Sequence, residues 1–317
     1  MDLEEKPLVS VLIPTFNRYD YLREAINSIV KQSYKEWEVI VVDDGSDKDV
    51  LNKVLKLETI DRRVKIYQRP DSYPKGVSGS RNYAFSKSNG DYIQWLDDDD
   101  LIDTDKLEVQ VEALEQINDS KTVAFSSWGY FNGNATYSEV ILNNGEDFSG
   151  IKELLHYFTS TEKFLPLHSY LIPRNLLFFA GEWNVNLRIN LDAEYMLRIL
   201  MHSSRIVNVS SVFCWYRSHD MPNISGTLLK EPHSFTMSLR LMSDHLHTLN
   251  ISCKPYFRQK MFRVFYRHWG KKRERSILLE HRNFFKEHGI NFKYAYYYIL
   301  KFKLYQLIMP KIKRYKS

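Results

Sequence analysis

Residues 92–103 read YIQWLDDDDLID, an apolar run that stops in four consecutive aspartates. A short apolar segment bounded by turn-forming residues is typical of a buried β-strand. Four adjacent carboxylates repel one another at neutral pH, so this stretch requires positive charge close by. A divalent cation such as Mn²⁺ or Mg²⁺, which takes oxygen ligands, would supply that charge.

Strand-like and helix-like segments alternate around this stretch. Strands are predicted at 8–14, 37–46, 64–68 and 91–96, and helices at 19–32, 50–58 and 78–88. Strands separated by helices predict an α/β fold with a mainly parallel central sheet that helices cover on both faces. After residue 226 the strand pattern ends, and the sequence becomes helical, basic and aromatic. We therefore expect two domains, residues 1–225 and residues 226–317, the second a helical C-terminal extension.

Polar residues follow three of the predicted strands. Residues 15–17 follow the first strand, Asp43 and Asp44 end the second, and residues 97–100 follow the fourth. The carboxyl ends of parallel strands meet at one edge, where open α/β sheets bind their ligands. We therefore expect these side chains to line one crevice.

The carboxylates decide the chemistry of this crevice. They can accept hydrogen bonds from a nucleobase or a ribose, and a cation bound among them can hold phosphate oxygens. The sequence has no Walker-type glycine loop and no G-x-G-x-x-G after its first strand. The segment GVSGS at 76–80 follows the third strand and is interpreted as a helix cap. The residues alone thus indicate a site for a nucleotide and a metal ion.

Three segments in combination resemble glycosyltransferase family 2. They are VSVLIPTFNR (9–18), WEVIVVDDGSDKD (37–49) and GVSGSRNYAFSKSNGDYIQWLDDDD (76–100), and the resemblance extends over roughly residues 7–225. It implies the nucleotide-diphospho-sugar transferase (GT-A) fold, an inverting transfer and a UDP-sugar donor. It also implies Mn²⁺ or Mg²⁺ as cofactor and a role in the assembly of bacterial surface polysaccharides.

The resemblance implies roles for residues on the donor side. Asp44, the second acid of the DDGS element, is expected to read the nucleobase. Pro14, Thr15 and Phe16 are expected to pack beside the bound nucleotide. All four residues follow or end predicted strands, in agreement with the expected crevice.

The aspartate run corresponds to the D-x-D element of the family. Asp97 and Asp98 are expected near the ribose and diphosphate, and Asp99 is the expected metal ligand. Because all four positions are Asp, this assignment can shift by one residue. Arg81 matches an arginine at the start of a family helix and is expected near the nucleotide or diphosphate. An exposed helix residue without a further role is the alternative for Arg81.

The acceptor side requires a base, because a sugar hydroxyl must lose its proton as it attacks. Asp192 stands where an apolar helix begins, in NLDAEYMLRIL, and resembles the catalytic aspartate of the family. Leu191 replaces the glutamate that usually precedes it, so Glu194 remains an alternative base. Helix capping is the alternative role for Asp192 itself.

Two further residues lie in segments that resemble the acceptor wall and a closing loop. Trp183 is either an aromatic face for a sugar ring or a core residue. His219, in CWYRSHDMPNISG, is a candidate third metal ligand or phosphate contact, or else a solvated loop residue.

Charge is distributed unevenly along the chain. Residues 251–317 carry 18 Lys and Arg and three Glu, whereas the preceding 250 residues carry 26 basic and 36 acidic residues. Basic residues that flank aromatic ones suit an anionic membrane surface. Nucleic acid is the competing partner, and it ranks lower because no nucleic-acid-binding motif accompanies the charge. A helical face packed on the catalytic domain is a third interpretation.

Other features of the sequence bear on its location. No apolar run reaches the roughly 18 residues of a membrane-spanning helix, and the first residues lack the pattern of a secretory signal. The two cysteines, Cys214 and Cys253, suggest a reducing compartment. We therefore expect a cytoplasmic protein that is peripheral on the cytoplasmic face of the membrane.

The predicted function is a metal-dependent inverting glycosyltransferase that adds one sugar from a nucleotide-sugar to a saccharide acceptor, expected to be lipid-linked. The Q-x-x-R-W element of processive synthases is absent from the sequence, which favours a single addition per encounter. A catalytically silent protein of the same fold that binds nucleotide-sugars or glycans is the alternative. A nucleotidyltransferase, which would release pyrophosphate, is a third possibility.

Overall fold

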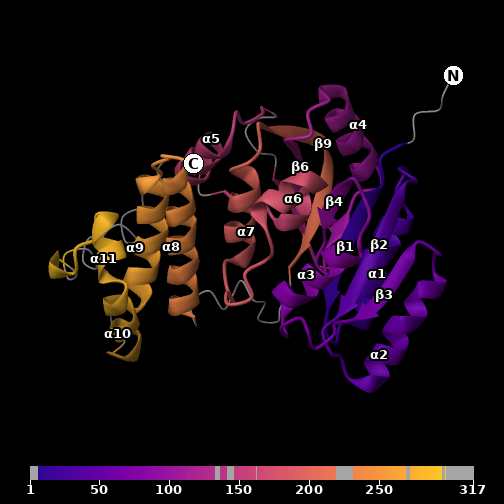
Figure 1. The fold of residues 1–317 in the computed structure, drawn as a ribbon, viewed down its shortest axis with the longest axis horizontal. Coiled ribbons are helices and arrows are strands. Elements are labelled where there is room, and N and C mark those ends of the chain that lie inside the picture. The colour runs from indigo at the N-terminus through magenta and orange to yellow at the C-terminus, as the bar shows by residue number, and fades with distance from the viewer. Residues whose placement is uncertain are drawn as a thin grey trace. The chain divides into compact units, whose positions relative to one another are not determined.

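The computed structural model describes residues 6–132, 136–140, 146–161, 163–218, 231–268, 272–294 and 297. The chain divides into two compact units. The first, the α/β unit, comprises residues 1–157, 163–186 and 191–221, and the second, the helical unit, comprises residues 158–162, 187–190 and 222–317. The central sheet belongs to the first unit, and helices α8 to α11 belong to the second (Figure 1).

The α/β unit begins with four parallel strands. They are β1 (Val9–Thr15), β2 (Trp37–Asp43), β3 (Val64–Gln68) and β4 (Tyr92–Trp95), in the order β3-β2-β1-β4. The helices between them are α1 (Tyr19–Val30), α2 (Lys48–Leu55) and α3 (Val77–Lys87). β1 is buried along its whole length, as its apolar sequence predicts. The α/β alternation expected from the sequence is confirmed.

The rest of this unit continues the sheet in mixed directions. The further strands are β5 (Leu101–Ile102), β6 (Thr122–Phe131), β7 (Thr136–Val140), β8 (Tyr170–Pro173) and β9 (Arg205–Arg217). β8 joins β4 and β6 in antiparallel pairs, whereas β6 and β9 are parallel. The helices are α4 (Lys106–Ile117), α6 (Arg174–Ala180) and α7 (Leu191–Leu200), and α5 (Ile151–Thr161) begins in this unit and ends in the helical one. The sheet is thus parallel where the sequence alternates strand and helix, and mixed beyond it.

The helical unit contains α8 (Pro232–Thr248), α9 (Lys254–His268), α10 (Lys272–Glu280) and α11 (Arg282–Glu287). Leu239, Met261, Phe265 and Phe285 are fully buried, so aromatic and aliphatic side chains form a core of this unit. Among the residues that the structure describes, no helix is both long and apolar enough to cross a membrane.

A buried polar network ties α4 to the sheet next to the aspartate run. Lys106 is 0% exposed, and its Nζ donates to Oε1 of Gln94 at 2.5 Å and to Oε1 of Gln110 at 2.6 Å. The two glutamines donate in turn to the backbone oxygens of His168 and Ser169. Burial lowers the pKa of Lys106 to about 7, although Cys214 and Asp103 act in the opposite direction. The two acceptors, on Gln94 and Gln110, match the two N–H groups that Lys106 has in its neutral form.

We predict that Lys106→Met flattens the pH dependence of stability above neutral pH. The folded-state pKa of Lys106 lies below its unfolded value, so between these two values the unfolded chain binds more protons and stability rises with pH. The difference in unfolding free energy, wild type minus variant, should therefore rise by up to about 1.4 kcal/mol per pH unit from pH 7 toward pH 10. Denaturant titrations at several pH values measure this difference.

Lys53→Met, which changes an exposed lysine on α2, is the matched control and should leave the pH dependence of the wild type unchanged. Parallel curves for the wild type and Lys106→Met would contradict the prediction.

Candidate functional site

Three parallel strands bring their polar carboxyl ends together, as predicted. Thr15 at the end of β1 donates its hydroxyl to Oδ2 of Asp98 at 2.7 Å, in a buried hydrogen bond. The backbone N–H of Asp44, which follows β2, donates to the backbone oxygen of Thr15 at 2.9 Å. Residues that lie 83 positions apart in the sequence therefore share one edge of the sheet.

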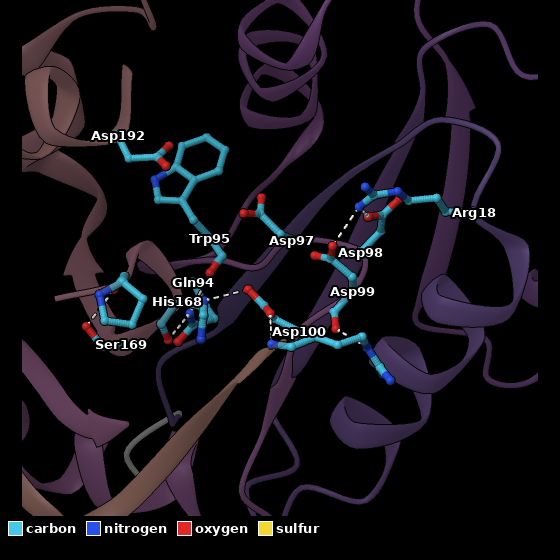
Figure 2. Close-up of polar contacts among 12 residues, drawn as sticks. Arg18, Gln94, Trp95, Asp97, Asp98, Asp99, Asp100, His168, Ser169 and Asp192 are labelled. Atoms are coloured by element: carbon cyan, nitrogen blue, oxygen red, sulfur yellow. Dashed lines mark hydrogen bonds and ion pairs between the residues drawn. The ribbon is translucent and has the colours of Figure 1, made fainter. Parts of the chain in front are cut away.

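The aspartate run divides its carboxylates among three partners, and Asp98 and Asp99 share Arg18 (Figure 2). Asp97 binds Arg81 at 2.6 Å, Asp98 and Asp99 bind Arg18 at 3.1 and 2.7 Å, and Asp100 binds His168 at 3.0 Å. The four adjacent carboxylates would repel one another, and cationic side chains of the protein supply the positive charge that reduces this repulsion. The sequence analysis missed Arg18 and His168, because nothing in their local pattern shows pairing across about 70 to 80 positions.

Asp100 belongs to the structural framework. Its Oδ1 accepts the backbone N–H of Arg217 on β9 at 2.9 Å, and its Oδ2 lies 3.0 Å from Nδ1 of His168. Asp100 is 2% exposed, and burial raises its pKa while His168 opposes that rise. Both oxygens are already bonded within the protein, which favours the assignment of the D-x-D element to Asp97–Asp99 over a shift by one residue.

Two carboxylates of the run converge on one point. Oδ1 of Asp98 and Oδ2 of Asp99 both contact the same nitrogen, Nη1 of Arg18. Burial, followed by the neighbouring Asp99, raises the pKa of Asp98 to about 7, although Arg18 and Thr15 lower it. The two carboxylate oxygens favour positive charge at the point on which they converge, and such hard oxygen donors fit Mg²⁺ or Mn²⁺.

The protein by itself offers few ligands to such a cation. Within the described ranges, no three His, Cys, Asp or Glu side chains lie together as a metal site. Mg²⁺ commonly takes one or two carboxylates and completes its coordination with water and substrate phosphates, so two donors are compatible with it. The other candidate ligand, His219, lies outside the described residues.

Arg81 bridges the donor-side aspartates and the candidate base. Its Nη2 donates to Asp97 and its Nη1 donates to Asp192, both at 2.6 Å. Arg81 is 2% exposed, so the alternative of an exposed helix residue is wrong. Its guanidinium lies over the ring of Trp183, 4.2 Å from the ring centroid. A rigid, buried cation therefore holds two carboxylates that lie 95 positions apart in the sequence.

Asp192 lies in the first turn of α7, where the sequence predicts it. Its side chain is 50% exposed, and desolvation by the surrounding protein raises the pKa of Asp192. Arg81 lowers this pKa and Asp97 raises it further. The carboxylate bonds to Arg81 and keeps half of its surface exposed, so an acceptor could contact it, and its role as a base stays a prediction.

Glu194, the alternative base, is buried and paired with Arg198. It is 2% exposed, and its two oxygens accept N–H groups of Arg198 at 2.7 and 3.0 Å. Arg198 also donates to the backbone oxygens of Ala180 and Glu182. Glu194 therefore fastens α7 to the segment before it, and Asp192 is the acid of this pair that an acceptor could reach.

Trp183 is a core residue. It is 2% exposed, stacks on Tyr195 at 3.9 Å between ring centroids and meets Trp95 edge-on at 5.3 Å. Tyr195 and Arg81 cover its two faces, so the expectation that Trp183 stacks on a sugar is wrong. Its backbone oxygen accepts from Nδ2 of Asn82, its backbone N–H donates to Oδ1 of Asn82, and its ring supports the Arg81 guanidinium.

The two acids of the DDGS element have different surroundings. Asp43 accepts the backbone N–H groups of Gly45 and Ser46 and so shapes the turn after β2. Asp44 contacts Nε of Arg69 at 2.5 Å and accepts the N–H of Gly76 at 3.0 Å. The sequence analysis did not identify Arg69, which follows β3 and shares the edge with Asp44.

The loop after β1 divides into a buried and an open part. Pro14 and Thr15 are buried, whereas the ring of Phe16 is 46% exposed. Lys75 lies over that ring, 5.3 Å from its centroid. Phe16 is thus available for contact beside Asp44, and the nucleotide contacts expected of these residues stay predictions.

Comparison with known proteins agrees with this architecture. The profile of the family described as "Glycosyl transferase family 2" matches residues 10–178, more than half of the chain. Crystalline TarS of S. aureus, residues 1–349 in complex with UDP-GlcNAc, superposes with a TM-score of 0.68 and 19% identity, over 93% of this chain and 88% of that one. The GT-A fold predicted from the sequence is thereby confirmed.

Curated relatives match shorter segments. TuaG of Bacillus subtilis, a glycosyltransferase assigned to teichuronic acid biosynthesis, is 36% identical over 39% of this chain and 47% of its own length. The UDP-Glc:alpha-D-GlcNAc-diphosphoundecaprenol beta-1,3-glucosyltransferase WfgD of Escherichia coli is 32% identical over 44% of this chain and 56% of its own length. The chain thus spans about half the length of these relatives. From the family match, the chain belongs to glycosyltransferase family 2.

Proposed function

We propose that this protein is a metal-dependent inverting glycosyltransferase that moves one sugar from a UDP-sugar to a lipid-linked saccharide in surface polysaccharide biosynthesis. The observation that carries the proposal is the Arg81 bridge, which brings Asp192 beside the D-x-D aspartates. WfgD, whose name gives UDP-Glc and a diphosphoundecaprenol-linked acceptor, supports the donor and acceptor classes. TarS, crystallised with UDP-GlcNAc, supports the donor class.

The proposed mechanism assigns one task to each group. A cation at Asp98 and Asp99 would neutralise the charge that develops on the departing nucleoside diphosphate. Asp192 accepts the proton of the acceptor hydroxyl, and its raised pKa makes it a better base near neutral pH. Arg81 holds Asp192 and Asp97 in place, so that acceptor and donor meet in one orientation. A single displacement inverts the anomeric centre.

We predict that one donor in a panel of UDP-, GDP- and dTDP-sugars releases nucleoside diphosphate in the presence of Mn²⁺ or Mg²⁺. Asp192→Asn should lower turnover by about 10² to 10⁴-fold, because a general base contributes a factor of that size. Donor binding measured by calorimetry should stay within a few-fold of the wild type. Coupled detection of the released nucleoside diphosphate measures turnover.

Glu194→Gln is the matched control, because it changes the neighbouring acid, whose two oxygens accept N–H groups of Arg198. It should lower stability while leaving turnover per folded molecule near that of the wild type. Unchanged turnover in Asp192→Asn would contradict the assigned base, and donor binding without any turnover in the wild type would favour a silent binding protein. Pyrophosphate release would favour a nucleotidyltransferase.

We also propose that the basic helical unit attracts the protein to the anionic cytoplasmic face of the membrane. Lys254, Arg258, Arg282 and Lys286 are exposed, and each such cation near an anionic surface adds to the attraction. The described aromatic residues of α9 and α11 are mostly buried in that unit, so these rings are not available to a membrane surface. The attraction proposed here is therefore electrostatic.

Sedimentation with vesicles tests this proposal. We predict binding to vesicles that contain phosphatidylglycerol, little binding to phosphatidylcholine, and loss of binding as salt rises. Arg282→Glu with Lys286→Glu should weaken the binding, whereas Lys53→Glu with Lys56→Glu, at exposed positions of the α/β unit, should weaken it less. Equal binding to both lipids, or tighter binding to nucleic acid, would overturn the proposal.

A further inference from the structure

Arg18 occupies the point on which two carboxylates of the aspartate run converge. Its Nη1 lies 2.7 Å from Oδ2 of Asp99 and 3.1 Å from Oδ1 of Asp98 (Figure 2). One nitrogen atom thus bridges two carboxylates from successive residues. This arrangement places a positive charge where the two negative charges would otherwise repel each other most strongly.

A divalent cation cannot share this position with Arg18. Oxygen ligands lie about 2.1 Å from Mg²⁺, so a cation bound to Asp98 and Asp99 would stand within the space that Nη1 fills. Two positive charges at such a separation also repel each other. Binding of the metal therefore requires the guanidinium to leave.

The local structure allows the guanidinium to leave without movement of the backbone. The side chain of Arg18 is 41% exposed, whereas that of Asp98 is 7% exposed. The preceding Asn17 is fastened by a hydrogen bond from its N–H to Oγ of Ser46 at 2.8 Å and by one from the N–H of Asp47 at 2.9 Å. The carbonyl of Arg18 itself accepts the first hydrogen bond of α1. Rotation of one side chain toward solvent is therefore sufficient.

We propose that Arg18 is an internal counterion that a divalent cation displaces from Asp98 and Asp99. This inference rests on the proposed metal-dependent function and adds a control on metal affinity to it. Displacement weakens binding of the metal alone. A donor restores this loss, because the released guanidinium is a cation that can pair with diphosphate oxygens at the same edge. Metal and donor thus favour each other's binding.

Calorimetric titration of the full-length protein with Mn²⁺, without any nucleotide, tests the inference. Arg18→Gln should bind Mn²⁺ about tenfold more tightly than the wild type, because the cation no longer competes with a charge-assisted pair. Arg18→Lys, which keeps the charge, should stay closer to the wild type. Arg23→Gln is the matched control, because Arg23 lies on α1, the helix that begins directly after Arg18, and pairs with the exposed Asp20 at 3.7 Å.

The outcomes separate this inference from the proposed function. Tighter binding in Arg18→Gln than in Arg23→Gln supports displacement. Equal affinity in these two variants overturns it and leaves metal dependence intact, whereas Mn²⁺ binding to none of the proteins overturns both. NMR of ¹⁵N-labelled arginine side chains, with Mg²⁺ as the cation, gives an independent readout. The Arg18 guanidinium should change from restricted to free rotation at saturation, and an unchanged signal overturns the inference.

Discussion

The crowding of four carboxylates at the end of β4 is the constraint on which the rest of the α/β unit depends. Two of the four, Asp98 and Asp100, are almost fully buried. Buried charges persist in proteins only where they are paired, so the acids of the run need partners of opposite charge. Arg18, Arg81 and His168 supply these partners, and Arg217 adds a backbone N–H.

The same pairing positions the elements of the candidate site. Asp100 fixes β9 through Arg217, and Arg217 donates in addition to the backbone oxygen of Asp99 at 2.7 Å. Arg81 fixes the start of α7 through Asp192. The charges that hold the second half of the unit in place are thus the charges that a nucleotide, a cation and an acceptor would meet. The paired aspartates and arginines thus serve both the fold and the proposed chemistry. Removal of one partner of a buried pair leaves the other charge uncompensated.

The sequence predicts the first part of this fold well because its signals are local. Apolar runs, helical spacing and the position of acids after strands locate β1 to β4 and the edge that they form. The first turn of α7, and Asp192 within it, follow from the same kind of pattern. Beyond β4 the strands no longer alternate with helices, so their mixed directions could not be read from periodicity.

Other features depend on contacts between distant segments. Arg18, Arg69 and Arg217 look like ordinary surface residues in the sequence, and only the fold brings them to the aspartates. The choice between Asp192 and Glu194 needed the position of Arg198, which engages both oxygens of Glu194. Trp183 fits a sugar platform by its residue type, but its burial between Tyr195 and Arg81 makes it a support. The domain boundary near residue 225 remains a prediction.

The most direct measurement is an anomalous difference map from a crystal soaked with UDP and Mn²⁺, recorded at the manganese absorption edge. We expect one peak within bonding distance of the Asp99 carboxylate. We also expect the uracil ring of UDP beside Asp44 and the Arg81 bridge between Asp97 and Asp192 preserved. A nucleotide bound away from the carboxyl edge of β1, β2 and β4, or a manganese ion that none of the aspartates contacts, would contradict the proposed active site.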